Sequence, residues 1–426
     1  MKMTLNQVKT NIQSGKYDKD FLMLYGDCEK ARTRYLNACE EFERIFNNTD
    51  NVRIFSAPGR TEVGGNHTDH QHGCVVAGGV DMDVIAIVGT NDDNVIRVKS
   101  KGYDMDVVNV NEFEKQEKEK GRAVSLIRGV CAKFAGLGYE INGFNAYTTS
   151  NVLKGSGLSS SAAFEVLLGN IVNGLFANKE VNAIEIAKIG QYAEREYFGK
   201  PCGLLDQMAS SLGGFTYADF NDPSEPITEK INLDIRDFGY TLCVVDTGGN
   251  HANLTQDYAD ITIECKQISN ALGVEFLRDA DVDKFYANMA DLRKEFGERA
   301  VLRAFHFFNE QQRVLKQREA LLKGDFTAFL KLVNESGQSS FDYLQNLYST
   351  TAVKEQGLSL AIALTKQFLG DDGACRVHGG GFAGTIQCYI PTVRLDDYKQ
   401  MIEAVYGEGS CSVLSIRPVG GYEIEL

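Results

Sequence analysis

The feature that most constrains this chain is a glycine- and serine-rich segment, NVLKGSGLSSSAAFEV at residues 151–166, set between a strand-like and a helix-like stretch. The preceding FNAYTTS has the aromatic and β-branched content of a strand. The following SAAFEVLLGNIVNGLF repeats its apolar residues at helical spacing. Glycines let the backbone approach a ligand closely, and the free amides and dipole at a helix start favour an anion. The segment therefore predicts a phosphate-binding loop.

The same segment fits neither of two common nucleotide loops. It contains no G-x-x-x-x-G-K-[ST], and Ser160 stands where a dinucleotide-binding loop needs its third glycine. A helix capped by Ser159 or Ser160 after a flexible turn would explain the composition without any ligand. At this point both a different phosphate cradle and a simple helix cap stay open.

The order of the segments predicts an α+β protein of two lobes. The chain has 426 residues, 43% of them hydrophobic, which is enough for a large core and two domains. We expect a helical N-terminal extension at residues 1–50, packed on a first lobe at residues 51–215. A second lobe is expected at residues 216–426.

Local patterns support this organisation. Apolar residues recur at helical spacing across residues 27–46 and again across residues 291–322. NVRIFSAPGR, residues 51–60, predicts a short strand that is broken by Pro58 and Gly59.

Charge and composition exclude several classes of partner. A formal net charge of -14 makes a large basic surface improbable, so we expect neither a nucleic acid nor a membrane as partner. The chain has no run of eighteen apolar residues and its start lacks a secretory signal, which predicts a cytoplasmic protein. Its ten cysteines are scattered without a CxxC pair, as reduced thiols are. A monomer is favoured, although the sequence does not fix the oligomeric state.

A histidine cluster in GRTEVGGNHTDHQHG, residues 59–73, raises the question of a metal site. His67, His70 and His72 lie close to Asp69 in the sequence, and both histidine and aspartate side chains can ligate a metal. The spacing H-x-x-H-x-H matches no established zinc pattern, so a scaffold role for His70 and His72 is favoured.

Two further segments carry candidate chemistry. KPCGLLDQMASSLGG supplies Asp206, a candidate for accepting or ordering a hydroxyl proton, although an aspartate at this position can also cap a helix. HGGGFAG, residues 378–384, precedes a strand-like stretch. Its glycines indicate either a tight bend or a place where a nucleotide presses on the backbone.

Taken in order, four segments resemble the galactokinases, a family of the GHMP small-molecule kinases that also include homoserine and mevalonate kinases. SAPGRTEVGGNHTDHQHG is similar to the family's sugar-binding signature, APGR-V-N-L-I-G-E-H-T-D-Y, and LKGSGLSSSAAFEV is similar to its phosphate loop. AEREYFGKPCGLLDQMASSLGG resembles the segment with the catalytic aspartate, and RVHGGGFAGTIQ resembles the third glycine-rich motif. Each segment alone is weak evidence, but the ordered set is highly specific.

The resemblance implies the two-lobed GHMP kinase fold, with the active site in the cleft between the lobes. It also implies ATP and Mg²⁺ as cofactors, with Ser161 and Glu194 holding the metal ion. Asp206 would orient or deprotonate the anomeric hydroxyl of a sugar, and Arg60 would stabilise charge on the transferring phosphoryl group. The nucleotide would lie along Gly155, Ser156, Gly157, Leu158, Ser159, Ser160 and Ser161.

Sugar contacts carry over from the family to five positions. His67 and Asp69 match residues that bind ring hydroxyls, Gly203 matches a glycine that lines the pocket, and Tyr258 matches a tyrosine from the second lobe. Asn66 stands where the family has a glutamate that contacts the C6 hydroxyl. An amide both donates and accepts and carries no charge, whereas a carboxylate only accepts.

Further departures concern the substrate more than the reaction. Glu62 replaces the family's asparagine, Gly64 an aliphatic residue and His70 a tyrosine, and the chain has no tryptophan. We expect an ATP-dependent sugar 1-kinase that converts galactose to galactose 1-phosphate. The alternatives are a kinase for galacturonate or another C6-altered pyranose, a galactokinase-like sugar sensor or regulator, and a metallohydrolase that uses the histidine cluster.

Overall fold

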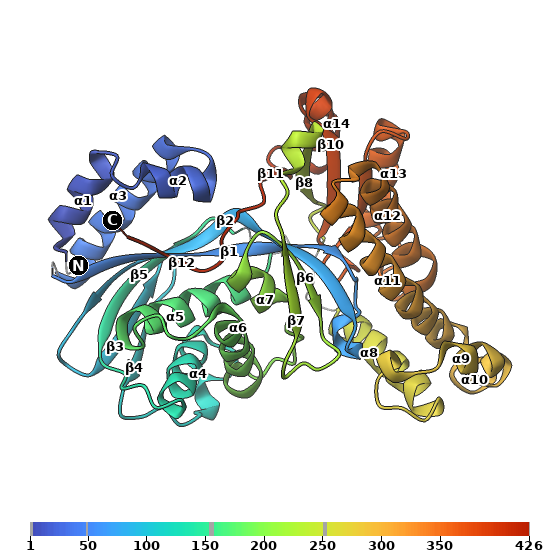
Figure 1. The fold of residues 1–426 in the computed structure, drawn as a ribbon, viewed down its shortest axis with the longest axis horizontal. Helices are drawn as coiled ribbons and strands as arrows, with labels where there is room; N and C mark the ends of the chain where they lie inside the picture. The colour runs from blue at the N-terminus through green and yellow to red at the C-terminus, as the bar shows by residue number, and fades with distance from the viewer. Residues whose placement is uncertain (1–2, 48–49, 153–156, 250–253, 426) are drawn as a thin grey trace.

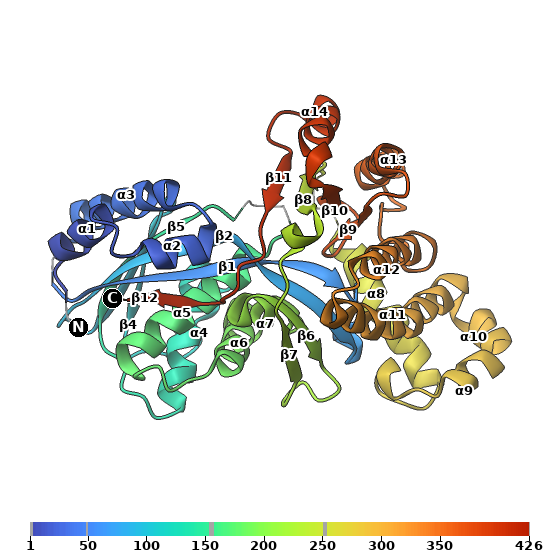
Figure 2. The same ribbon diagram turned by 45° about the horizontal axis from the view of Figure 1, so that its top comes forward.

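The computed structural model describes residues 3–47, 50–152, 157–249 and 254–425. In this part of the chain the strands form one sheet of eight strands and one of four (Figures 1 and 2). The larger sheet has the order β12-β1-β2-β5-β3-β4, with β6 paired to β2 and β7 to β6. The smaller sheet has the order β11-β8-β10-β9.

The larger sheet contains β1 (Val52–Gly64), β2 (Cys74–Thr90), β3 (Val95–Ser100), β4 (Met105–Asn109), β5 (Phe144–Ser150), β6 (Phe215–Asp219), β7 (Ile227–Ile231) and β12 (Tyr422–Ile424). The smaller sheet contains β8 (Tyr240–Asp246), β9 (Ala374–His378), β10 (Thr385–Pro391) and β11 (Cys411–Leu414).

The helices before the second sheet are α1 (Leu5–Gln13), α2 (Asp18–Tyr25), α3 (Cys28–Phe46), α4 (Ala123–Gly136), α5 (Ser160–Phe176), α6 (Ala183–Tyr192) and α7 (Leu205–Leu212). Those that follow are α8 (Thr255–Ala271), α9 (Val282–Ala287), α10 (Met289–Phe296), α11 (Glu298–Lys323), α12 (Phe326–Ser339), α13 (Gly357–Leu369) and α14 (Leu395–Tyr406). Short helical turns are η1 (Asp69–Gln71), η2 (Glu117–Glu119), η3 (Ala193–Phe198), η4 (Ile235–Phe238), η5 (Leu277–Asp279), η6 (Ser340–Leu344) and η7 (Thr392–Arg394).

Alternate residues of β1 and β2 supply a separate core on each face of the larger sheet. Ile54, Ile85 and Ile87 belong to the buried cluster formed with α1, α2 and α3. Phe55 and Val84 belong to a second cluster formed with α4, α5 and α6. Both views show the N-terminal helices on one side of this sheet and α4–α6 on the other (Figures 1 and 2). The sheet is therefore the middle of three layers.

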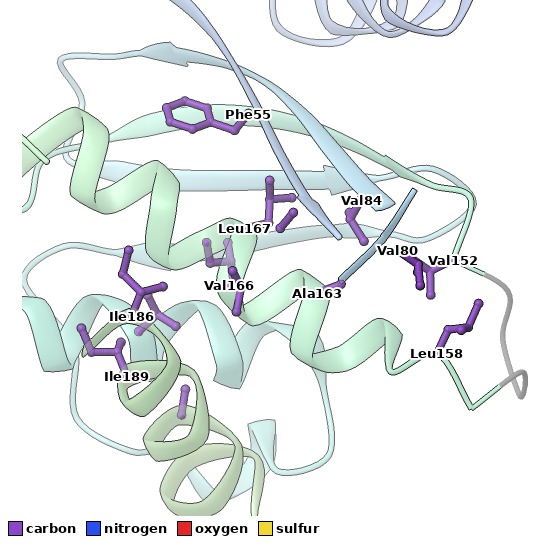
Figure 3. Packing of buried hydrophobic residues seen from close by; sticks show 14 of the residues in the cluster. Phe55, Val80, Val84, Val152, Leu158, Ala163, Val166, Leu167, Ile186 and Ile189 are labelled. Carbon is purple, nitrogen blue, oxygen red and sulfur yellow. The ribbon is translucent and has the colours of Figure 1, made fainter. Parts of the chain in front are cut away.

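The start of α5 is anchored in the second of these cores (Figure 3). Val152 and Leu158, which stand on either side of residues 153–156, are both buried. Further along α5, Ala163 and Val166 pack into the same cluster. Burial of one leucine side chain contributes about 1.5–3 kcal/mol, so Leu158 holds the beginning of the helix against the sheet.

Several sequence predictions are confirmed. The helix expected at residues 27–46 is α3, whose N-cap residue Asp27 accepts hydrogen bonds from two amides of the first turn. The strand and helix that flank the glycine-rich segment are β5 and α5. The helical pattern at residues 291–322 is divided between α10 and α11 by Gly297, whose φ of 84° is left-handed.

One prediction was wrong, because β1 is not broken at Pro58 and Gly59 but runs from Val52 to Gly64. Its pairing with β2 instead shifts register between Pro58 and Arg60. A bulge of this kind accommodates a proline, which lacks an amide donor, without ending the strand. The continuous strand also carries Arg60, which pairs with Asp206 of α7.

The division into sheets does not follow the boundary expected at residue 215. β7 and β12, which come after residue 215, both belong to the larger sheet, and β12 pairs with β1. The smaller sheet and the helices α8–α14 lie between them in the sequence. Within the described residues, no helix has both the length and the apolar character needed to span a membrane.

A buried ionic cluster ties the N-terminal helices to the larger sheet. The Asp83 carboxylate of β2 forms ion pairs with Arg34 of α3 at 2.5 Å and with Arg417 at 3.2 Å. The Tyr25 hydroxyl donates a hydrogen bond to Asp83 at 2.6 Å. Burial alone would raise the pKa of the Asp83 carboxyl, but the two arginine charges bring it below its usual value. Three distant parts of the chain thus meet at one carboxylate.

Asp83→Asn is expected to lower the free energy of unfolding by about 3–5 kcal/mol, because two guanidinium groups lose their buried counter-charge. Asp93→Asn removes the half-exposed partner of Arg97 and serves as the matched control, with an expected loss below about 1 kcal/mol. Urea unfolding followed by circular dichroism measures both. Equal unfolding midpoints in the two variants would contradict this role of Asp83.

Candidate active site

A crevice of about 340 Å³ is lined by residues from separate parts of the chain. One part of its wall comes from Arg60 of β1, residues 157–161 at the start of α5, Lys200, which precedes α7, and Asp206 in the first turn of α7. The other part comes from Tyr258 of α8 and from His378 with the glycine-rich loop between β9 and β10. The structure thus brings the four segments singled out in the sequence to one cavity.

Asp206 and Arg60 form an ion pair in this crevice. Asp206 lies in the first turn of α7, and its Oδ1 accepts a hydrogen bond from Arg60 Nε at 2.6 Å. Its Oδ2 accepts a hydrogen bond from the Ser159 hydroxyl at 2.8 Å. Arg60 also donates to the carbonyl of Gly157, and its amide donates to the carbonyl of Leu158 at 2.9 Å. The β1 arginine therefore joins the loop before α5 to the carboxylate on α7.

These contacts keep Asp206 ionised. Burial by itself would raise the pKa of its carboxyl, but the charge and hydrogen bond of Arg60 lower it below the usual value, and Ser159 adds to this effect. Each carboxylate oxygen has two lone pairs and uses one of them to accept a hydrogen bond from the protein. Asp206 therefore retains acceptor capacity for a further hydroxyl group.

The described part of the predicted phosphate loop has the geometry of a helix start aimed at the crevice. Ser159 is the N-cap of α5 with a left-handed φ of 55°, and Ser160 and Ser161 begin the helix. Gly157 also has a left-handed φ, and a Cβ there would lie 2.9 Å from the His378 ring. The predicted positions Gly155 and Ser156 lie outside the described residues. Leu158 turns its side chain into the core rather than into the crevice.

Glu194 is buried on the π-helical turn η3, behind the same crevice. Its Oε1 accepts a hydrogen bond from Lys200 Nζ at 2.9 Å, and its Oε2 accepts one from Gln207 Nε2 at 2.8 Å. Gln207 Nε2 also donates to Glu165 at 2.9 Å. Burial, followed by the Glu194 charge, raises the pKa of Glu165 well above its usual range, which favours the neutral form of Glu165.

The residues present fit a magnesium ion. A serine hydroxyl and a carboxylate are hard oxygen ligands, which Mg²⁺ prefers, and it is commonly bound through one or two carboxylates together with substrate phosphates. Ser161 lines the crevice, and Glu194 is linked to its wall through Lys200. The second oxygen of Glu165 has no partner in the described part of the chain.

Four of the predicted sugar-binding residues lie beside this centre. Asp69 packs against Gly203 so closely that a Cβ on Gly203 would overlap its carboxylate. His67 Nε2 lies 2.9 Å from the carbonyl of Gly380. The Tyr258 hydroxyl donates to the carbonyl of Gly381 at 2.9 Å. The glycine-rich loop between β9 and β10 thus connects the predicted sugar contacts of the two lobes.

Asp69 is partly buried and lies in an acidic environment. Burial, the charge of Asp206 and the charge of Glu62 together raise the pKa of the Asp69 carboxyl to about 7. This carboxyl therefore exchanges a proton near neutral pH, and its hydrogen-bonding character changes with it.

Asn66 occupies a place that the sequence did not predict. Its side chain has no exposed surface. Its Nδ2 donates to Glu62 at 2.9 Å and to the carbonyl of Gly379 at 2.8 Å, while its Oδ1 accepts from Asn346 at 2.8 Å. Because its donors and its acceptor are already used by the protein, this geometry argues against a direct contact between Asn66 and the C6 group of a sugar.

The histidine cluster does not form a metal centre. In the part of the chain that the structure describes, no group of three or more histidine, cysteine, aspartate or glutamate side chains is placed to hold a metal ion. His72 stacks on Phe276 with ring centroids 3.6 Å apart, and the rings of His67 and His70 pack edge to face. These contacts leave the metallohydrolase hypothesis without structural support.

Lys200 and His378 also line the crevice, although the sequence offers little signal for either. Lys200 belongs to a quoted segment, but a lysine beside Pro201 carries no pattern that marks it as a ligand. His378 was treated only as the start of a glycine-rich motif, yet its ring bridges the hydroxyls of Thr61 and Thr385 at 3.1 and 3.0 Å. Only the fold brings these side chains to the crevice.

Two family models and several relatives are similar to this chain. Residues 123–214 match the GHMP kinases N terminal domain, and residues 40–90 match the galactokinase galactose-binding signature. The galactokinase of Glaesserella parasuis is 30% identical over 380 residues, which cover 86% of this chain and 92% of that protein. The galactokinase of Lactobacillus helveticus is 29% identical over 382 residues, covering 86% and 94%.

Solved structures share the fold. The Lactococcus lactis galactokinase complexed with galactose superposes with a TM-score of 0.76 at 24% identity, covering 90% of this chain and 98% of that one. The Methanococcus jannaschii mevalonate kinase gives a TM-score of 0.59 at 16% identity, covering 85% and 98%. The architecture is therefore that of the GHMP kinases.

Asn66→Glu is expected to destabilise the protein by on the order of 3 kcal/mol, because it places a second carboxylate beside the buried Glu62 and removes two donated hydrogen bonds. The double variant Glu62→Asn/Asn66→Glu restores one amide and one carboxylate and should recover much of the loss. Chemical denaturation of the three proteins measures the coupling. Wild-type stability of Asn66→Glu would show that this side chain is not buried as described.

Proposed function

This chain belongs to the galactokinase family, and from that premise we propose that it transfers the terminal phosphoryl group of ATP to the anomeric hydroxyl of galactose, giving galactose 1-phosphate. The observation that carries the proposal is the crevice in which Arg60, Asp206 and the serine-bearing start of α5 meet. Phosphoryl transfer needs alignment and charge stabilisation more than covalent help from the protein.

Asp206 acts first as an acceptor that orients the attacking hydroxyl. Its pKa lies below the usual value because of Arg60, so the carboxylate is a weak base before the reaction begins. A hydrogen bond from the anomeric hydroxyl to a free lone pair of Asp206 directs an oxygen lone pair at the phosphorus atom. The proton can pass to Asp206 as the hydroxyl becomes acidic during bond formation.

Arg60 stabilises the developing negative charge. Its guanidinium is fixed by Asp206 and by the carbonyl of Gly157, so it is already oriented before the substrates bind. A fixed cation at the site of developing charge lowers the barrier without a reorganisation cost.

The nucleotide phosphates are proposed to lie along residues 157–161. The amides at the start of α5 and the dipole of this helix favour an anion there, and the hydroxyls of Ser160 and Ser161 add donors. The Ser159 hydroxyl donates its hydrogen bond to Asp206, so its role is to position that carboxylate. ATP is the expected phosphoryl donor for a member of this family.

Ser161 and Glu194 would hold a magnesium ion, which supplies charge neutralisation between the phosphate oxygens when bound. Gln207 fixes one oxygen of Glu194 and leaves the other toward Lys200. Glu165, whose pKa is raised, adds no competing charge to this position.

The sugar is proposed to bind beside Asp69, His67, Gly203 and Tyr258. A carboxylate that accepts from two neighbouring hydroxyls suits a pyranose ring, and the backbone of Gly203 lets the sugar approach closely. Galacturonate or another C6-altered pyranose is the second candidate substrate, because the family's glutamate near C6 is replaced by the uncharged and fully engaged Asn66.

The cytoplasm is the proposed location. All ten cysteines are free thiols and most are buried, which suits a reducing compartment.

The proposed function is tested by a coupled ATP-consumption assay with galactose, galacturonate, N-acetylgalactosamine, arabinose and glucose. Galactose is expected to be the preferred substrate and to yield the 1-phosphate, identified by ³¹P NMR. Asp206→Asn should lower kcat by about 10²–10⁴ with little change in galactose affinity, because a positioned base contributes that much.

Each other outcome has a distinct meaning. Turnover with galacturonate alone would favour the second candidate, and phosphate on C6 would contradict the proposed pose. Galactose binding without turnover of any sugar would favour a sensor. An Asp206→Asn variant with normal turnover would remove Asp206 from the mechanism.

The KM for galactose is expected to fall as the pH rises through about 7. Burial and the Asp206 charge raise the pKa of Asp69 to about 7, and the ionised form accepts hydrogen bonds that the protonated form cannot. The predicted change is roughly tenfold between pH 6 and pH 8.5. Asp69→Asn does not titrate and should show a higher KM that is flat with pH; a flat profile in the wild type would refute the role of Asp69.

A further inference from the structure

Lys200 is a cation at the crevice that the mechanism above does not use. Its backbone amide and that of Gly199 both donate to the carbonyl of Glu194, which closes the chain after the π-helical turn η3. Its side chain then folds back, so that Nζ lies 2.9 Å from Glu194 Oε1. The side chain is 58% exposed and lines the crevice beside the start of α5.

The other charged groups of the crevice are already committed. The Arg60 guanidinium is 8% exposed and is held by Asp206 and by the carbonyl of Gly157. The ammonium of Lys200, in contrast, has three donors on a flexible stem, and Glu194 accepts one of them. Lys200 is thus the more exposed and less constrained of the two cations.

The charges of the crevice also require Lys200. Arg60 and Lys200 carry two positive charges, and Asp206 and Glu194 carry two negative ones. Without Lys200 the site would present a net negative charge to a triphosphate, which is itself strongly anionic. In the absence of a metal ion, the amides and dipole of the helix start would be the remaining favourable contribution against this repulsion.

We propose that Lys200 is a phosphate-binding residue of the nucleotide site, and that its ammonium moves between the Glu194 carboxylate and the terminal phosphate oxygens. This inference rests on the proposed function and deepens it. If Glu194 binds a magnesium ion, the Lys200 ammonium loses the Glu194 carboxylate as its acceptor. A phosphate oxygen in the same crevice then accepts the hydrogen bond instead. The exposed, flexible side chain of Lys200 permits this exchange, whereas Arg60 is already held by Asp206 and the carbonyl of Gly157.

The test is nucleotide binding without metal, measured by isothermal titration calorimetry of ATP in EDTA. Lys200→Gln is expected to weaken ATP binding by about tenfold to a hundredfold, as loss of a charge-assisted hydrogen bond does. Lys200→Arg should stay within a few-fold of the wild type. Lys188→Gln removes a lysine paired with Glu185 on α6, outside the crevice, and should leave the affinity unchanged.

The Glu194→Gln background separates a phosphate contact from simple neutralisation of Glu194. If Lys200 only neutralised the carboxylate, its removal would have no effect once that carboxylate is gone. The proposal instead predicts that Glu194→Gln binds metal-free ATP more tightly than the wild type, and that Glu194→Gln/Lys200→Gln loses at least tenfold relative to it. Equal affinities in these two variants would overturn the proposal.

Two controls keep the result interpretable. Thermal unfolding of each variant reports whether it is folded, and Lys200→Arg reports the charge without the lysine geometry. Sugar phosphorylation by the wild type tests the proposed function separately. Turnover of galactose together with unchanged ATP binding in Lys200→Gln would reject the role of Lys200 alone.

Discussion

The whole arrangement depends on a buried polar seam that joins the far end of β1 to the second lobe. Glu62 of β1 pairs with Arg376 of β9 at 2.6 Å, and the arginine has no exposed surface. Gln387 of β10 donates to Thr61 and to the carbonyl of Glu62. Because a buried charge without its partner is very unfavourable, this seam fixes the relative position of the lobes. The seam therefore also fixes the distance between the walls of the neighbouring crevice.

The ion pair between Arg60 and Asp206 is built on this fixed strand. Arg60 precedes Thr61 and Glu62 on β1, so the seam that holds the lobes together also orients the guanidinium toward α7. Leu158 holds the start of α5 from the opposite side by burial in the apolar core. Polar contacts thus position the wall of the crevice that faces the second lobe, while apolar packing positions the wall formed by the start of α5. Asp206 lies where the two constraints meet.

The N-terminal helices pack against the other end of the same strand, β1. Ile54, Ile85 and Ile87 would face solvent without α1–α3, and the ionic cluster around Asp83 fixes those helices in place. Their contacts are to the sheet, and the crevice residues lie on other elements. The extension therefore acts as a cover for one face of the sheet, which the relatives' shared signature at residues 40–90 does not reveal.

The sequence by itself determined the local elements and the chemistry of the loops. Helix periodicity fixed α3 and α5, and residue types with their order identified the family, because both depend on near neighbours in the chain. It misread Pro58 and Gly59 as a strand end, since a bulge is stabilised by the partner strand β2. It also assigned Asn66 to the sugar and overlooked Lys200. Contacts between residues hundreds of positions apart, such as Asn66 with Asn346, decide whether a polar side chain is free for a ligand or is already hydrogen-bonded within the protein. These contacts exist only in the tertiary structure.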